Sequence, residues 1–300
     1  EPHAFASTDA GGRWAQIPNL PTTHYDDMLV HPRDKDLVLA THGRSFWILD
    51  DTRALAEWAN ASGPVTVFSA DRGTIQVYRK DTSYRGQAAF AGANPVDGIE
   101  ITYKLGEGGG GAVLTVTNAM GATVREIQVP SSTGTHRVNW DLRHSAPGSA
   151  STWQRFSNPE LARSIADRGP WVSPGSYMVT VHARGTSAST RVEVRGDPEM
   201  PISLAMYESR ERFMLGMLAL TDEIATYRRA NDFGGGGGRG ARPPIDTPAG
   251  KLAAAAGTVQ QVYGALNGRG VRPGTLYPPT EAQRAAVQNA RSLFEEVRGR

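Results

Sequence analysis

The spacing of the apolar residues changes its period near residue 200, and this change sets the order of secondary structure along the chain. Before it, apolar and polar residues alternate, as in Ile99–Tyr103, which predicts strands with one buried face. After it, apolar residues such as Met217, Leu220 and Ile224 recur every three or four positions, which predicts amphipathic helices. We therefore expect a mainly β chain with an α-helical C-terminal region.

The composition limits the classes of function. A net charge of +2 is too small to indicate binding to nucleic acid or to an anionic membrane. The absence of cysteine excludes disulfides, cysteine nucleophiles and thiolate metal sites. No apolar run approaches the roughly 18 residues that a transmembrane helix needs, so we expect no transmembrane segment.

The pattern divides the chain into four parts. We expect parts of four-stranded β units over 1–60, connecting strands and a linker over 61–97, a β-sandwich of six or seven strands over 98–197, and helices over 198–300. Three apolar stripes predict a helical hairpin or three-helix bundle, whose last helix starts at a capping box, Thr280 with Gln283. The glycine run 234–238 lacks the ending of a phosphate-binding loop, which favours a flexible linker. A short helix is expected within an insertion near 157–162.

The first turn is a recognisable motif. Ser7, Asp9, Gly11 and Trp14 fit S-x-D-x-G-x-x-W, the Asp box. Its Ser and Asp side chains can bond to backbone N–H groups of the turn, its Gly permits an unusual φ, and its Trp can fold back as a plug. We interpret it as a structural turn.

A second hairpin has a histidine and an arginine in its turn. The apolar runs 37–40 and 46–49 flank the turn 41–45, which contains His42 and Arg44. Such residues are usually solvated, but they can also bind a carboxylate or sugar hydroxyls.

The segment from the Asp box to Asp51 resembles the final blade of the bacterial sortilin-like (Vps10-type) BNR/Asp-box β-propeller "glycosyl hydrolase" proteins. The resemblance implies that residues 1–60 form terminal β-propeller blade(s). In that family this segment follows most of one or two propellers, so the resemblance also implies an exported protein whose present chain cannot close a propeller alone. Because the first residue is Glu, we expect the numbering to describe a processed piece or part of a longer chain. Trp140-Asp141 and Pro174–Tyr177 resemble an Ig-like domain of flagellar-hook-cap type.

The blade topology predicts where a ligand would bind. It places the turn 41–45 beside the stretch 22–27, on the face opposite the Asp box. His42, Arg44 and His24 are therefore candidate ligand-binding residues, and Asp26 and Asp27 are weak catalytic candidates. The alternative is that Arg44 forms an internal Arg–Asp pair that holds the blade shut.

The sequence is compatible with two functions. The first is a non-catalytic binding or assembly module, which completes a propeller with sequence or a second chain not present here and has a possible glycan or peptide ligand. The second is part of a propeller glycoside hydrolase, which needs paired carboxylates, one of them in the rest of the propeller. No His pair with metal-ligand spacing occurs, so we expect no metal and no cofactor. Trp140, Tyr177 and Tyr103 are expected in the core.

Overall fold

The computed structural model describes residues 3–17, 20–58, 61–77, 97–145, 169–233, 243–269 and 272–299. The chain forms two compact units. The first comprises 1–73, 98–141 and 175–194, and the second comprises 74–97, 142–174 and 195–300. The expected insertion helix near 157–162 and the glycine run 234–238 lie outside the described residues.

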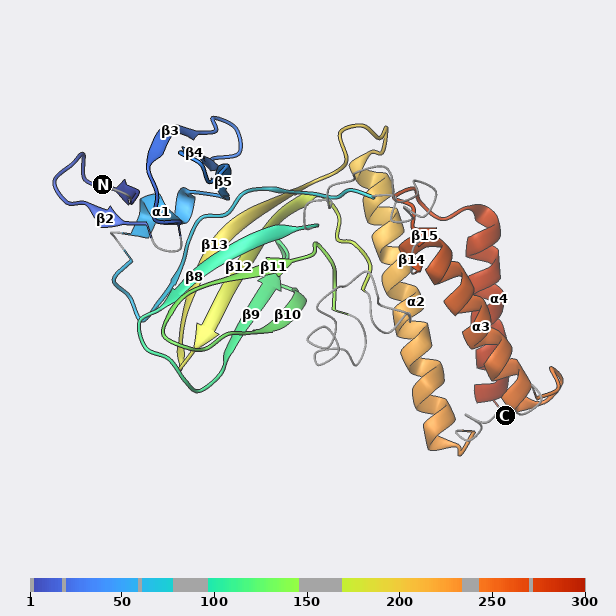
Figure 1. The fold of residues 1–300 in the computed structure, drawn as a ribbon. Coiled ribbons are helices and arrows are strands. Elements are labelled where there is room, and N and C mark those ends of the chain that lie inside the picture. Colours follow the sequence, from blue (N-terminus) through green and yellow to red (C-terminus); the bar gives the residue numbers. More distant parts are fainter. Residues whose placement is uncertain are drawn as a thin grey trace. The chain divides into compact units, whose positions relative to one another are not determined.

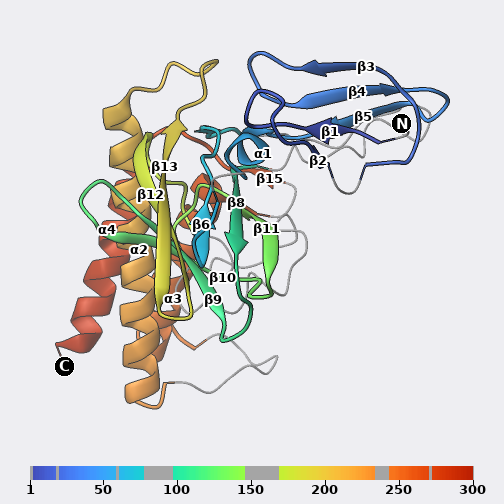
Figure 2. The ribbon, with the colours of Figure 1, turned by 90° about the vertical axis from the view of Figure 1, so that its left-hand side faces the viewer.

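The N-terminal part of the first unit contains two small antiparallel sheets (Figures 1 and 2). Strand β1 (Phe5–Ala6) pairs with β2 (Ala15–Gln16) around the Asp box. Strands β3 (Tyr25–Val30), β4 (Leu37–Thr41) and β5 (Phe46–Leu49) follow in the spatial order β3-β4-β5, and helix α1 (Arg53–Glu57) comes next. The predicted hairpin and its turn are confirmed.

The sheet β3-β4-β5 has two different faces. Leu37 and Leu39 are buried on one face, where they pack against Ala4 and Ile17 from the segments that flank the Asp-box hairpin. We call this the covered face. Residues that alternate with these, and so project from the other side, form the open face: Leu29, Val38, Ala40, Phe46 and Ile48.

The same unit contains two larger antiparallel sheets. One has the order β10-β9-β12-β13-β7 and the other β11-β8-β6. Trp140 and Tyr103 are fully buried, and Trp140 contacts Tyr177 with ring centroids 5.3 Å apart, so the prediction that these aromatic residues belong to the core is confirmed. The strands are β6 (Val65–Val67), β7 (Gly73–Thr74), β8 (Ile99–Leu105), β9 (Ala112–Thr117), β10 (Thr123–Val129), β11 (Gly134–Trp140), β12 (Gly175–Ala183) and β13 (Thr186–Arg195).

The second unit carries three long helices. They are α2 (Leu204–Ala230), α3 (Pro248–Asn267) and α4 (Glu281–Arg298). Two short strands, β14 (Gly268–Arg269) and β15 (Arg272–Pro273), pair antiparallel between α3 and α4. Their apolar stripes form one core that includes Met217, Leu220, Ile224, Val259 and Phe294. The capping box of Thr280 and Gln283 is formed, which confirms the predicted start of α4.

Strands account for 31% of the structure and helices for 30%, so the fold is mixed and the expected β majority is an overestimate. Within the region 61–97, where connecting strands were expected, β7 is limited to Gly73–Thr74, and residues 75–77 are not in a strand. None of the helices in the described ranges combines the length and apolarity needed to cross a membrane.

Candidate functional site

The stretch 22–27 and the turn 41–45, which were predicted to be neighbours, lie side by side. The backbone N–H of His42 donates to the carbonyl of His24 at 2.9 Å, and the Thr23 hydroxyl reaches the carbonyl of His42 at 3.4 Å. The other connection of these strands, 31–36, lies at the opposite ends of β3 and β4, because antiparallel strands reverse at each turn. The hairpin therefore presents His42 and Arg44 beside 22–27, as predicted.

The side chains at this end are only loosely organised. His42 Nδ1 lies 3.5 Å from a carboxylate oxygen of Asp26, and both side chains are mostly exposed to solvent. An exposed pair at this distance contributes little orientation, because water screens it. The Arg44 side chain makes no ion pair with any residue that the structure describes, so the internal Arg–Asp pair that we considered is not formed within this part of the chain.

Asp27 has a structural task at the edge of the sheet. Its carboxylate accepts a hydrogen bond from the backbone N–H of Met28 at 2.8 Å. Met28 pairs with Leu39, and the register shifts by one residue between Tyr25 and Asp27, which makes a β-bulge. A bulge and a side chain bonded to the backbone both blunt the free edge of a strand. Asp27 therefore protects the outer edge of β3.

His24 contacts the backbone of His42, but it lines a surface that His42 and Arg44 do not share. Its side chain lines an open hollow of about 600 Å³ between the Asp-box hairpin and β3, together with His3, Ala4, Phe5, Trp14, Tyr25 and Met28. His42 and Arg44 do not line this hollow. The candidate set is therefore split between two places. The alternation of residues along β3 does not predict this split, because the bulge at Asp26 shifts the register of β3 against β4.

The Asp box has the hydrogen bonds that its motif predicts. The Ser7 hydroxyl donates to Asp9 at 2.9 Å and accepts from the Gly11 N–H at 2.8 Å, while Asp9 accepts from the Arg13 N–H at 2.8 Å. The bond from Arg13, followed by that from Ser7, lowers the pKa of the Asp9 carboxyl. Trp14 differs from the prediction: it is 64% exposed and lies against the hollow, so it is not a buried plug within the described structure.

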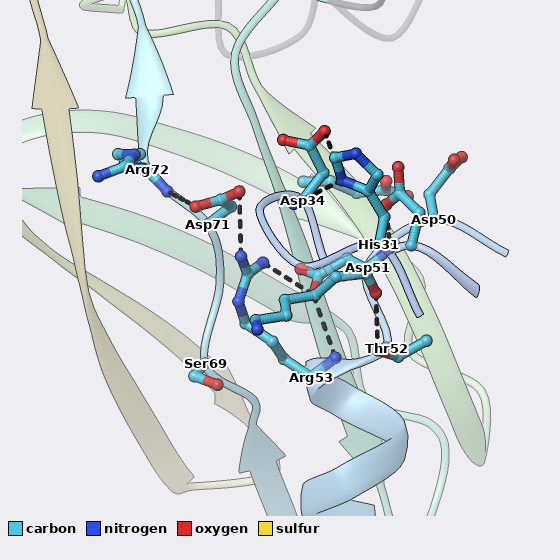
Figure 3. A network of polar contacts seen from close by, with 12 residues as sticks. His31, Asp34, Asp50, Asp51, Thr52, Arg53, Ser69, Asp71 and Arg72 are labelled. Carbon is cyan, nitrogen blue, oxygen red and sulfur yellow. Dashed lines mark hydrogen bonds and ion pairs between the residues drawn. The ribbon is translucent and has the colours of Figure 1, made fainter. Parts of the chain in front are cut away.

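An ion-pair network holds the segment that follows β5 (Figure 3). Arg53 lies 2.8 Å from Asp51 and 3.0 Å from Asp71. Burial lowers the pKa of its guanidinium, but the two carboxylates outweigh this effect and raise that pKa. On the preceding turn, His31 Nδ1 lies 3.1 Å from Asp34. The carboxylates of Asp51 and Asp71 thus share the Arg53 guanidinium, as in a structural cluster.

A second polar cluster, which the sequence did not indicate, lies in the helical unit. Glu211 on α2 accepts hydrogen bonds from the Ser173 hydroxyl, from the Ser173 N–H at 3.1 Å and from His144 Nε2 at 2.5 Å. Burial raises the pKa of Glu211, but the bonds from His144 and Ser173 outweigh burial and lower it. The carboxylate lies between the serine and the histidine, so this is not the Ser–His–Asp order of a hydrolase triad.

Two buried arginines lie beside this cluster. Arg143 stacks 3.7 Å from the Trp171 ring and donates to the side chain of Asn267 at 2.8 Å. Arg210 lies 5.2 Å from the same ring and donates to the carbonyls of Leu266 and Thr275. Burial lowers the pKa of Arg210 to about 10. Both guanidinium groups thus donate to acceptors at the C-terminal end of α3, and Arg210 also donates to the loop that follows it.

Chemically, the described residues contain exposed binding groups and structural polar clusters. They contain no group of three or more His, Asp or Glu residues that could hold a metal ion. The candidate carboxylates are those of Asp26, which is exposed, and Asp27, which accepts a hydrogen bond from the Met28 N–H.

Comparisons with known proteins add little. No family model matches the chain. No curated protein matches it either. Among solved structures, it is similar to a chain described as "Biofilm associated protein - BSP domain", with 8% identity and a TM-score of 0.19, over 55% of this chain and 23% of that chain. The match spans less than a quarter of that longer chain, and at this TM-score it supports no argument about fold or function.

Proposed function

We propose that this chain is the C-terminal, non-catalytic binding and assembly portion of an exported sortilin-like β-propeller protein. In this proposal the sheet β3-β4-β5 is a propeller blade, which is completed by sequence or by a chain outside the one described here. The sheets over 98–195 form an Ig-like sandwich, and the helices form the bundle that follows it.

The observation that carries the proposal is the open face of β3-β4-β5. Leu29, Ile48 and Phe46 on this face are 59%, 60% and 73% exposed. A soluble sheet normally has one apolar and one polar face, whereas a sheet with two apolar faces belongs between two layers. The covered face has its layer in the segments around the Asp-box hairpin, so the open face is the place for a second layer.

The Asp box supports the same conclusion independently. Its hydrogen bonds are formed, and the residues that flank it pack on the covered face, as neighbouring blades would do. The motif and the packing together favour a propeller over an isolated three-stranded sheet, because an isolated sheet would leave the apolar open face in water.

The alternative of a glycoside hydrolase has weaker support. It requires two carboxylates that flank a glycosidic bond. Asp27 bonds to the Met28 N–H, and Asp26 is a solvated partner of His42.

Site-specific photo-crosslinking tests the assembly proposal. A photoreactive amino acid would replace Leu29 on the open face in the protein as its cells make it, and crosslinked peptides would be identified by mass spectrometry. We expect crosslinks to peptides from strands next to an Asp-box motif. A probe at Arg191, an exposed strand residue on β13, is the matched control and should give no such crosslink. Equal crosslinking at both positions, or none at position 29, would contradict the proposal.

A further inference from the structure

Strand β1 has one free edge, which borders the hollow beside the Asp-box hairpin. Among the described strands only β2 pairs with β1, and each of these two strands is two residues long. The segment from His3 to Phe5 lines the hollow, and so do Tyr25 and Met28 on β3, whereas no residue of β2 is part of this lining. The hollow therefore lies on the side of β1 that β2 leaves free. A two-stranded hairpin is marginally stable alone, and a third strand would stabilise it.

The hydrogen bonds of this hairpin show which backbone groups point to the free edge. The Ile17 N–H donates to the carbonyl of Ala4 at 2.9 Å, so the backbone groups of Ala4 face β2. The next pair in the register is Phe5 with Gln16. Because backbone groups alternate in direction along an antiparallel strand, Phe5 directs its N–H and its carbonyl away from β2. The free edge therefore offers one hydrogen-bond donor and one acceptor at Phe5.

The outer edge of β3, whose side chains line the same hollow, differs from the free edge of β1. The Asp27 carboxylate accepts a hydrogen bond from the Met28 N–H at 2.8 Å, and the bulge at Asp26 interrupts the register. Both features blunt an edge against a further strand. Strand β1 has neither feature, because its register is regular and Phe5–Ala6 contains no charge and no proline. An edge of this kind is a template for another strand.

The side chains around the hollow define the chemistry of a strand that fits there. The lining consists of apolar, aromatic and histidine side chains and contains no Asp, Glu, Lys or Arg. Met28 pairs with Leu39 and so lies on the covered face, yet it is 54% exposed. In a strand added to β1, the residues on either side of the one opposite Phe5 face the same way as Ala4, which packs on the covered face. Both must be apolar, because a charge would be buried there without an ionic partner.

We propose that the free edge of β1 receives a third, antiparallel strand from the sequence that completes the propeller. Its pattern is apolar-x-apolar, centred on the residue opposite Phe5. The central residue exchanges two hydrogen bonds with Phe5, and its two neighbours fill the hollow against Tyr25 and Met28. This inference rests on the proposed function and adds a second contact to it. The open face receives a layer on one side of β3-β4-β5, whereas this strand extends the Asp-box hairpin on the other side.

Amide hydrogen exchange at single-residue resolution tests the added strand, by comparing the isolated chain with the protein as its cells make it. The Phe5 amide should exchange at least about tenfold more slowly in the cellular protein, because the added strand supplies an acceptor for its N–H. Val30 on β3 is the matched control. The His31 N–H donates to the carbonyl of Asp36, so the N–H of Val30 points away from β4 to the blunted edge. Its exchange rate should be the same in both samples.

Equal exchange of the Phe5 amide in the two samples overturns the proposal. Equal slowing of Phe5 and Val30 overturns it too, because general burial and not a strand on β1 would then protect both amides. Protection of Phe5 that grows with the concentration of the isolated chain would assign this edge to a second copy, against the proposal. The crosslinking test at Leu29 reports on the open face, so it can succeed while Phe5 stays unprotected. Failure of both tests would refute the proposed function itself.

Discussion

Glu211 is the centre of the polar cluster in the helical unit, and its removal gives a defined prediction. The carboxylate accepts from His144, from the Ser173 N–H and from the Ser173 hydroxyl. A hydrogen bond to a charged group contributes roughly 1.5–3 kcal/mol, and Glu211→Gln keeps one oxygen acceptor but loses the charge. Allowing for partial exposure, we expect Glu211→Gln to lower the free energy of unfolding by about 2–4 kcal/mol at pH 7.

The pH dependence of this loss has a definite sign. The folded-state pKa of Glu211 lies below its ordinary value of 4.5, so the unfolded chain binds the proton more readily than the folded one. Its contribution to stability is fully present above pH 4.5 and is lost as the pH falls through the folded-state pKa. The wild type and Glu211→Gln should therefore differ most near neutral pH and converge in acid.

Urea unfolding monitored by tryptophan fluorescence, at several pH values from neutral to acid, measures both quantities. Glu208→Gln is the matched control, because Glu208 lies on the same helix and is exposed. It should change the unfolding free energy little at any pH. The reasoning is refuted if Glu211→Gln costs no more than Glu208→Gln at pH 7, or if its cost persists undiminished in acid.

Three further predictions concern the N-terminal sheets. Leu39→Ala should destabilise the unit by about 2–5 kcal/mol in thermal or chemical unfolding, because Leu39 is fully buried on the covered face, whereas the same change at the exposed Leu29 should cost much less. Asp9→Ala should speed hydrogen exchange of the Arg13 amide, which loses its acceptor, and an unchanged rate would show that the Asp box bond is absent in solution. The Thr41 N–H donates to the carbonyl of Ser45, so the backbone groups of Trp47 face β4 and those of Ile48 point away from it. Ile48→Pro should therefore leave the sheet folded by circular dichroism, whereas Trp47→Pro should unfold it. Equal effects of the two variants would contradict these backbone directions.

Much of the secondary structure follows from local patterns. The alternation in Ile99–Leu105 and the stripe through Met217 and Ile224 each describe the burial of one element by its neighbours, so a short window of sequence suffices. The adjacency of the turns 22–27 and 41–45 was also predictable, because it depends only on the order of antiparallel strands.

The polar clusters were not predictable in the same way. Arg210 and Glu211 look like solvated residues of a helix, and their partners His144, Ser173 and Thr275 are distant in sequence. The surface that His24 lines was not predictable from alternation, since the bulge at Asp26 shifts the register of the side chains before it. Propeller blades and Ig-like sandwiches are defined by how neighbouring layers pack, which no single sequence pattern specifies.

Oxidative footprinting tests the assembly role of the open face most directly. Hydroxyl radicals would label the isolated chain and the assembly recovered intact from its cells, with Phe46, 73% exposed, as the reporter and Met120, 89% exposed on the turn between β9 and β10, as the control. We predict that Phe46 is labelled in the isolated chain and protected in the assembly, while Met120 is labelled in both. Equal labelling of Phe46 in the two samples would contradict the account.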